Sequence, residues 1–473
     1  MQELTPDICV IGSGAGGLAA ASAAAAFGVP VALIANNGFG NESRKGAAVS
    51  SRVLLAAAAR ADVLRTGTSF GLRPGRYGID FGAVTAHMHD VARATCANDT
   101  RERFAALGVH VIDGVGRFTD KRTVAADHVV VRARRFVIAT GSSPALPAIP
   151  GLADTPHLTG ETVTELTDCP RHLIVIGAGA AGLEMAQAFR RLGAAVTVLD
   201  AAKPLVGEDP ECAAIVLDAL DEDGVALHAG VVIKGVRRAL ARVLVDIEGP
   251  GGAETIEGTH LLIAAGRRPN VEALELDAAG IGYGPDGIIV DKRLRTTNKR
   301  VYALGDVTAG ANAAHLASYH AELVVRHAVF RQPVAVDYRA IPAVTYTDPE
   351  LAQVGFLEDE ARVHAGAIRV LRWPYRDNDR ARSEQATKGH IKIVTDRKGG
   401  ILGVTIVGAQ AGEAIAAWTL AIGQKLNIGA FAGLIAPDFT YGEVGKRAAT
   451  TYFRGSLTSS RVRRIIGWLR RLG

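Results

Sequence analysis

The fold of this chain is decided near its start, by the segment Asp7-Ile8-Cys9-Val10-Ile11-Gly12-Ser13-Gly14-Ala15-Gly16-Gly17. Residues 7–11 have the continuous apolar character of a buried parallel strand. An alanine-rich helix over 18–27 and a second strand over 29–34 are predicted to follow the glycines. In such a unit the first glycine makes the turn, the second lets the backbone approach a pyrophosphate, and the third lets the helix pack on the strand. The free N–H groups of the helix start favour phosphate. The residues expected to bind a dinucleotide here are Gly12, Gly14, Ala15 and Gly17.

The same arrangement recurs 165 residues later. An apolar strand over 171–176 leads into Gly177-Ala178-Gly179-Ala180-Ala181-Gly182, and a helix and a strand over 195–200 follow. One such glycine pattern is a weak signal, but a chance glycine-rich turn is a poor explanation for two copies with strand, helix and strand in place. The second copy predicts another dinucleotide site at Gly177, Gly179 and Gly182.

The two copies differ at the position that normally binds the adenosine ribose. In the second copy Asp200 stands 23 residues after Gly177, where a carboxylate accepts from the ribose 2′-OH and repels a 2′-phosphate. This residue favours NADH over NADPH. In the first copy the equivalent residue is Ala35, which leaves Asn36 or Asn37 to hold the ribose.

Composition excludes several classes of protein. The chain has 473 residues, 48% of them hydrophobic, which predicts two to four globular domains and excludes a disordered or fibrous protein. Its four cysteines lie far apart with no CxxC pair, so neither a disulfide scaffold nor a zinc ribbon is indicated, and reduced thiols in a cytosolic compartment are expected. The uncharged stretch 8–41 is broken by glycines, which argues against a membrane span, and the N-terminus lacks the basic region of a secretory signal.

The net charge of +5 belongs to the C-terminal end. Residues 444–473 carry eight lysines and arginines and no acid, so the rest of the chain is mildly acidic and does not indicate nucleic-acid binding. Within this tail, apolar residues recur at helical spacing between arginines: Val462, Ile465, Ile466, Leu469 and Leu472, with Trp468 at the boundary. The pattern suits an interfacial helix on anionic lipid, and it also suits a solvated or dimer-packed terminal helix.

Four further segments complete a resemblance. They read Phe136-Val137-Ile138-Ala139-Thr140-Gly141, Ala264-Ala265-Gly266-Arg267-Arg268-Pro269-Asn270, Val301-Tyr302-Ala303-Leu304-Gly305-Asp306, and Ala343-Val344-Thr345-Tyr346-Thr347-Asp348-Pro349-Glu350. With the two glycine patterns, they make the chain resemble the flavoprotein disulfide reductase family, in its mercuric reductase and dihydrolipoamide dehydrogenase branches. The resemblance implies an α/β fold with two Rossmann-like domains and a C-terminal α+β dimerisation domain. In that last domain, the sequence itself predicts strands around 390–394 and 401–407, in an antiparallel sheet with flanking helices.

The resemblance also implies boundaries, cofactors and binding residues. The expected parts are an FAD domain over 1–150 and 271–337, an NAD(P) domain over 151–270, a dimerisation domain over 338–455 and a basic amphipathic tail over 456–473. Thr140 and Gly141 are implied at the end of the FAD domain, and Gly266 at the end of the NAD domain. The implied flavin contacts are Asp306, His315 and Ala317. No spaced cluster of ligands predicts a metal.

The chain departs from the family at its redox centre. The positions of the family's redox-active cysteine pair are Ser43 and Ala48 here, so disulfide exchange of the family type is excluded. At the C-terminal end, the position of the family's histidine is Ala436, while Glu443 is retained. No cysteine follows Cys212, so mercury chemistry is not expected.

The residues that the resemblance places beside the nicotinamide are retained, apart from one change. The resemblance places Glu184 beside the nicotinamide, paired with Arg52, which stands where the family has a lysine near the flavin. Arginine keeps its charge at all working pH values, so it can orient and polarise but does not readily donate a proton. The expected catalytic residues are Arg52, Glu184 and Glu443, with a plain buried ion pair as the alternative for the first two.

These features predict a cytoplasmic, homodimeric, FAD-dependent NAD(P)H:acceptor oxidoreductase that prefers NADH and has no disulfide relay. The small residues Ser43, Gly46, Ala47 and Ala48 are expected to leave room over the flavin for a flat acceptor such as a quinone. The alternative is a flavin- and NAD-binding sensor or partner protein that has lost turnover. Peripheral membrane contact through the tail is a further interpretation, and the sequence does not name the acceptor.

Overall fold

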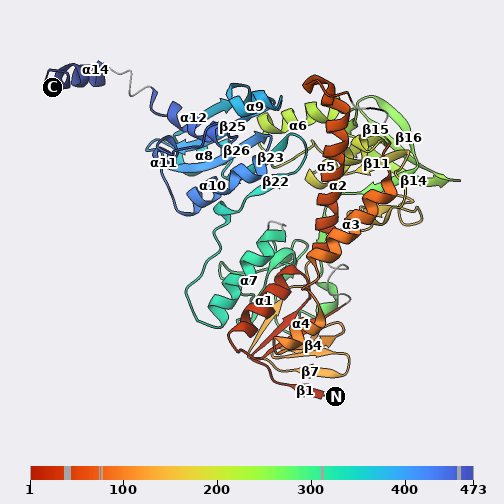
Figure 1. The fold of residues 1–473 in the computed structure, drawn as a ribbon. Helices are drawn as coiled ribbons and strands as arrows, with labels where there is room; N and C mark the ends of the chain where they lie inside the picture. The colour runs from red at the N-terminus through yellow and green to blue at the C-terminus, as the bar shows by residue number, and fades with distance from the viewer. Residues whose placement is uncertain are drawn as a thin grey trace. The chain divides into compact units, whose positions relative to one another are not determined.

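The computed structural model describes residues 2–36, 44–73, 75, 78–310, 314–454 and 460–471. By its internal contacts the chain forms two compact units, drawn in Figure 1. The first unit comprises Met1–Ala202 and Leu227–Val336, and the second comprises Lys203–Ala226 and Asp337–Gly473. The domain boundaries expected from the resemblance remain a prediction.

The first glycine pattern begins a five-stranded parallel sheet of the first unit. Its central strand lies between two strands far apart in sequence, so that Val10 pairs with Leu33 on one side and Val137 on the other. All four residues of the central strand are buried, as the apolar run predicts. The strand order is β21 (Val301–Ala303), β8 (Arg135–Ile138), β2 (Ile8–Ile11), β3 (Val31–Ala35) and β4 (Val109–Asp113).

The second glycine pattern is built in the same way. Parallel pairing joins four strands of another five-stranded sheet, in which Ile174 lies between Thr197 and Leu261. The strand order is β10 (Leu158–Thr159), β17 (His260–Ile263), β11 (His172–Ile176), β12 (Ala195–Asp200) and β13 (Ala226–Ala229). A three-stranded antiparallel sheet of β14 (Val232–Ala239), β15 (Arg242–Gly249) and β16 (Gly252–Gly258) accompanies it. The predicted α/β class with two dinucleotide-binding sheets is confirmed.

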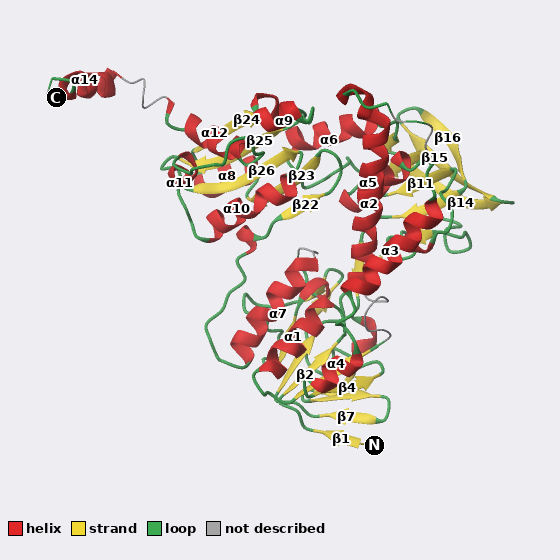
Figure 2. Cartoon of the chain, viewed as in Figure 1, coloured by secondary structure: helices red, strands yellow, loops and turns green. Residues whose placement is uncertain are grey.

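Helices cover both parallel sheets, as Figure 2 shows. The helix after the first glycine turn, α1 (Ala15–Ala26), packs closely on α7 (Ala314–Ala328). A side chain at Gly16 would lie only 3.1 Å from the Cβ of Ala317, so small residues set this helix distance. The helix after the second turn, α5 (Ala180–Arg191), packs on the long helix α2 (Arg44–Thr66), which also packs on α3 (Phe81–Thr95).

The second unit is built on a five-stranded antiparallel sheet. Its order is β22 (Ala343–Thr345), β23 (Glu350–Gly355), β26 (Ile401–Gly408), β25 (His390–Asp396) and β24 (Ile368–Pro374), which confirms the two strands predicted there. Helices α8 (Glu358–Ala365), α10 (Ala411–Gly423) and α12 (Glu443–Thr451) pack on it. Trp418 and Phe431 stack in its core, with their ring centroids 3.6 Å apart.

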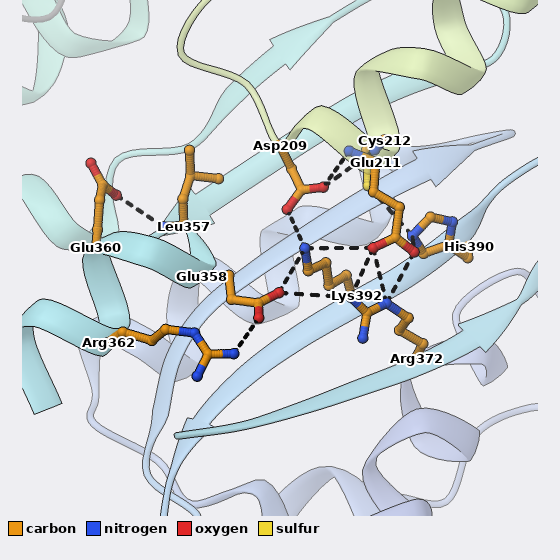
Figure 3. A network of polar contacts seen from close by, with 10 residues as sticks. All are labelled: Asp209, Glu211, Cys212, Leu357, Glu358, Glu360, Arg362, Arg372, His390 and Lys392. Carbon is orange, nitrogen blue, oxygen red and sulfur yellow. Dashed lines mark hydrogen bonds and ion pairs between the residues drawn. The ribbon is translucent and has the colours of Figure 1, made fainter. Parts of the chain in front are cut away.

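One helix of the second unit comes from the middle of the chain. Helix α6 (Pro210–Glu222) follows β12 in sequence but packs on β23 and β26. Its N-cap Asp209 is 2% exposed and accepts from the ammonium of Lys392 at 2.7 Å. Around this pair lie further ionisable groups, shown in Figure 3: Glu211, Glu358, Arg362, Arg372 and His390. We call this set, with Asp209 and Lys392, the α6 charge cluster.

The chain ends in α14 (Ser460–Leu469). Its large apolar side chains and the arginines among its described side chains are exposed. In the described part of the chain, no helix combines the length and the apolar content needed to span a bilayer.

Candidate functional site

Two glycine turns have nearly the same geometry at the ends of β2 and β11. Gly12 has a φ of +113°, and Gly177 has a φ of +115°. A Cβ at either glycine would lie 2.4 Å from a backbone carbonyl oxygen, of Ala139 in the first turn and Ala264 in the second. Both the backbone conformation and the close approach therefore require glycine at these positions.

The next glycines of each pattern have different tasks. A Cβ on Gly17 would lie 1.9 Å from the carbonyl oxygen of Gly12, and one on Gly182 would lie 2.0 Å from that of Gly177, so the helices need glycine to pack on their turns. By contrast, no atom lies within 4 Å of a Cβ built on Gly14, the N-cap of α1. The same holds for Gly179, the N-cap of α5.

Both helix starts therefore present backbone to open space. Neither N-cap supplies a side-chain hydrogen bond to the helix, and α1 begins at Ala15 without an acid in its first turn. A phosphate group fits such a position, because the N–H groups and the helix dipole favour negative charge. The residues present thus fit two dinucleotides, with one cradle at the end of each parallel sheet.

The acid predicted to bind ribose lies beside the second cradle. Asp200 Oδ2 accepts from the N–H of Ala178 at 2.6 Å, and its Oδ1 accepts from the N–H of Ala202 at 2.8 Å. In the first copy Ala35 is buried at the end of β3. Asn36 follows as an exposed residue, and Asn37 lies outside the described residues.

Hydrogen bonds join the ends of two segments, residues 136–141 and residues 264–270. The Thr140 hydroxyl donates to the carbonyl of Asn270 at 2.8 Å, and the Asn270 backbone N–H donates to the carbonyl of Gly141 at 2.9 Å. Gly141 and Gly266 both have positive φ values, of +69° and +105°. These contacts hold the segment after β17 next to the end of β8.

A chain of polar contacts leads from Asp306 to Arg267. Asp306 is buried and accepts from the hydroxyl of Ser142 at 2.9 Å. That hydroxyl accepts from Arg267 Nε at 2.8 Å, and Arg267 Nη2 donates to Glu161 at 2.8 Å. The sequence indicates Arg267 only as part of a motif, and it does not indicate Ser142 or Glu161. The positions of these partners come only from the tertiary fold, so no local signal could have found them.

The histidines of α7 differ in their surroundings. His315 is exposed, and Ala317 is half-buried where Gly305 approaches the helix. His320 is 1% exposed, and its Nδ1 accepts from the N–H of Gly305 at 3.2 Å. Burial lowers the pKa of His320 to about 4, so this ring is neutral at physiological pH and holds the turn that carries Asp306.

Arg52 and Glu184 lie together between α2 and α5. The guanidinium Nη1 is 3.7 Å from Glu184 Oε2, and the glutamate is buried on the first turns of α5, close in sequence to Gly182. Ala48 is an exposed residue of α2, one turn before Arg52. Ser43 lies outside the residues that the structure describes, as do the side chains of residues 44–47, so the acceptor pocket expected there stays a prediction.

Comparison with known proteins now gives the family. The profile described as pyridine nucleotide-disulphide oxidoreductase matches residues 6–321, and that of the same family's dimerisation domain matches residues 341–449. The chain belongs to the pyridine nucleotide-disulphide oxidoreductase family. The predicted recognition is confirmed, and the family is a class of enzymes whose members bind FAD and NAD(P).

Relatives in this family cover nearly the whole chain. A mercuric reductase of Streptomyces lividans is 33% identical over 455 residues, which are 94% of this chain and 96% of that protein. A dihydrolipoyl dehydrogenase of Geobacillus stearothermophilus is 31% identical over 93% of this chain and 94% of its own. The crystal structure of LpdA from Mycobacterium tuberculosis has a TM-score of 0.84 at 27% identity and covers 95% of this chain and 99% of its own.

The four cysteines of this family member are free and mostly buried. All four are free thiols, and Cys9, Cys96 and Cys212 are buried. Burial raises the pKa of Cys9 and of Cys212, which keeps both thiols protonated and poorly nucleophilic. Among the residues that the structure describes, no group of three side chains is placed to hold a metal ion.

Glu443 belongs to the second unit of this pyridine nucleotide-disulphide oxidoreductase. It begins α12, and its Oε1 accepts from both Nε and Nη2 of Arg447, at 2.9 and 2.7 Å. Ala436, at the position of the family's histidine, is half-buried. The role of Glu443 therefore remains a prediction.

We expect Glu184→Gln to slow reduction of the bound flavin by NADH about tenfold or more, because it removes the charge that orients Arg52 beside the glycine turn. The measurement is anaerobic stopped-flow at the flavin absorbance. Asp62→Asn is the matched control, since Asp62 lies 3.9 Å from Arg191 and makes an ion pair between the same two helices farther from the turn. Equal rates in both variants and the wild type would identify the Arg52–Glu184 contact as structural only.

Proposed function

We propose that this protein is an FAD-dependent NAD(P)H:acceptor oxidoreductase that prefers NADH and passes electrons from the reduced flavin directly to an acceptor such as a quinone. One observation carries the proposal. Both dinucleotide cradles are intact, while no cysteine lies between Cys9 and Cys96, the part of the sequence in which the family has its redox pair. The two sites for NADH and FAD are thus retained, and the cysteine pair that would pass electrons on from the flavin is absent.

When bound, FAD accepts a hydride from NADH and passes the two electrons to the acceptor. The chain's own residues bind and orient. Gly14 and Gly179 leave room for the two pyrophosphates, and Asp306 lies on a buried turn where the family contacts the flavin chain. Arg52 carries a permanent positive charge 3.7 Å from Glu184, which supports a role in orienting the nicotinamide and polarising the ring system.

An apolar surface supports an apolar acceptor. In the family, the segment around Ala436 is contributed across the dimer to the redox site. Here this segment presents Ile435, which is 91% exposed, and Phe439, which is 65% exposed. With Ala436 in place of a histidine, the segment offers contact area for a flat ring and no acid–base group. The match to the family's dimerisation domain supports the homodimer that this arrangement needs, and four free thiols support a cytoplasmic location.

Asp200 supports the preference for NADH. Its carboxylate stands at the end of β12, fixed by two backbone N–H groups, where it repels a 2′-phosphate. We expect Asp200→Asn to shift the ratio of kcat/KM values for NADH and NADPH about tenfold toward NADPH, because the amide keeps an acceptor oxygen and loses the charge. Steady-state rates with both nucleotides measure the ratio, and an unchanged ratio would remove Asp200 from the specificity argument.

The proposal is tested on the purified flavoprotein without oxygen. NADH is expected to bleach the flavin absorbance, and a soluble quinone is expected to restore it, whereas lipoamide and oxidised glutathione are expected to leave it bleached. Flavin that is reduced by NADH but reoxidised by no quinone contradicts the acceptor. Rapid turnover with a disulfide substrate contradicts the missing relay.

The second candidate is a flavin- and NAD-binding sensor or partner protein without turnover. It is favoured by the combined absence of an acid at Ala35, of a histidine at Ala436 and of the cysteine pair. The same titration separates the two functions, because a sensor without hydride transfer keeps its yellow colour when NADH is added.

A further inference from the structure

We infer that α14 binds the surface of an anionic lipid bilayer. The helix spans Ser460–Leu469, and Val462, Ile465, Ile466 and Leu469 follow the spacing i, i+3, i+4, i+7. This spacing places the four side chains on one face of a helix. The inference goes beyond the proposed function, because binding to lipid requires neither flavin nor NADH.

Three of the four residues of the apolar face are exposed. Ile465, Ile466 and Leu469 are 56%, 48% and 52% exposed, and the neighbouring Trp468 is 61% exposed. Four large apolar side chains within five residues are costly to leave in water. A ten-residue helix has no core of its own to bury them, so an external apolar phase is needed.

The other side of the helix defines the charge of the partner. Arg463 and Arg464 on the helix, and Arg470 and Arg471 directly after it, are all exposed, and the sequence has no acidic residue after Glu443. Such a surface attracts an anionic partner and repels a cationic one. Trp468 lies at the boundary between the two faces, where an indole ring sits well at the level of lipid headgroups.

A bilayer satisfies both faces at once. A helix of ten residues is about 15 Å long, half of the hydrocarbon thickness of about 30 Å, so it lies in the interface plane instead of crossing it. A second copy of α14 would cover the apolar face but would bring the same arginines with no acid to neutralise them. A nucleic acid would match the arginines and leave the apolar face in water.

The test uses the full-length flavoprotein and vesicle flotation. We expect binding to vesicles of phosphatidylcholine with about 30% phosphatidylglycerol and little binding to phosphatidylcholine alone, with release when salt is raised well above the physiological level. Ile466→Ser is expected to weaken binding about tenfold or more. Gly467→Ser is the matched control, because it places the same side chain one position along, on the polar side, where a new Cβ meets no atom within 4 Å.

Three results would overturn the inference. They are equal binding to both kinds of vesicle, equal binding of Ile466→Ser and Gly467→Ser, and undiminished binding of a chain ending at Arg454. A change of oligomeric state in Ile466→Ser with unchanged vesicle binding is a case of the second result, and it would identify α14 as an interface between copies. Reduction of soluble quinone is measured on the same samples. Loss of vesicle binding with unchanged turnover, or the reverse, distinguishes failure of this inference from failure of the proposed function.

Discussion

Gly182→Ala is expected to destabilise the first unit by about 3 kcal/mol, whereas Gly179→Ala is expected to fold normally and bind NADH about tenfold more weakly. The reason is geometric. A methyl group at Gly182 would lie 2.0 Å from the backbone oxygen of Gly177, which cannot move without opening the turn. A methyl group at Gly179 meets no protein atom within 4 Å and projects into the space left for the pyrophosphate.

Two measurements separate the variants. Thermal unfolding reports the first effect as a clear drop in Tm, and anaerobic titration of the flavin with NADH reports the second at unchanged Tm. Both substitutions leave the first cradle, which is expected to bind FAD, unchanged. The flavin content of Gly179→Ala should therefore match that of the wild type. If Gly179→Ala binds NADH as tightly as the wild type, the second cradle does not hold the nicotinamide dinucleotide.

Lys392→Met is expected to destabilise the second unit by about 3–5 kcal/mol. The Lys392 side chain is 7% exposed, and its ammonium lies 2.7 Å from Asp209 and 3.1 Å from Glu358, inside the α6 charge cluster (Figure 3). Methionine keeps the length of the side chain and removes the charge, so the Asp209 carboxylate, 2% exposed, loses its cation in a place that water does not reach. The measurement is the unfolding free energy from denaturant titration.

Lys388→Met is the matched control for this prediction. Lys388 also pairs with a carboxylate of α6, that of Glu222, but both side chains are more than half exposed. Exposed pairs contribute little because water and salt screen them, so the change in stability should stay below about 1 kcal/mol. Similar losses in the two lysine variants would show that burial does not set the strength of this cluster.

The cluster also predicts how stability depends on pH. Hydrogen bonds from Arg372 to Glu211 and from Arg362 to Glu358 hold the pKa values of both carboxyls below their usual range. Their contribution is present above the ordinary glutamate pKa and is lost as pH falls through the lowered values. For Lys392, burial acts to lower the pKa, but hydrogen bonds to Asp209 and Glu358 outweigh it and the pKa is raised. That contribution is present below the ordinary lysine pKa and is lost at higher pH. Lys392→Met should therefore remove the alkaline limb, and it should also weaken the acid limb, because Lys392 helps to lower the pKa values of Glu211 and Glu358.

Much of the fold and of the two glycine turns could be predicted from local sequence patterns. Gly12 and Gly177 were identified from the residues around them, because a strand, a tight turn and a helix leave a signature within about 30 residues. The class of the fold and the antiparallel sheet of the second unit were predicted correctly for the same reason. The contact between Arg52 and Glu184 came from the resemblance, since nothing in spacing brings residues 132 positions apart together.

Features that depend on tertiary contacts were missed. The partners of Asp306 and Arg267 lie on other elements, and Ser142 in the sequence is an ordinary serine after a strand. Helix α6 has the usual amphipathic pattern, which says that one face is buried but not against what. Its packing on the last sheet depends on β25, whose Lys392 lies 183 residues after Asp209.

The origin of α6 has a consequence for dissecting the protein. The polypeptide leaves the first unit after Ala202, returns at Leu227 and leaves again after Val336, so neither unit is made from one uninterrupted stretch. A fragment ending at Val336 would keep α6 but lose β23 and β26, and the helix would be left without its sheet. Expression of this fragment alone should therefore give insoluble material. The same fragment with residues 203–226 replaced by a short polar linker is expected to give more soluble protein.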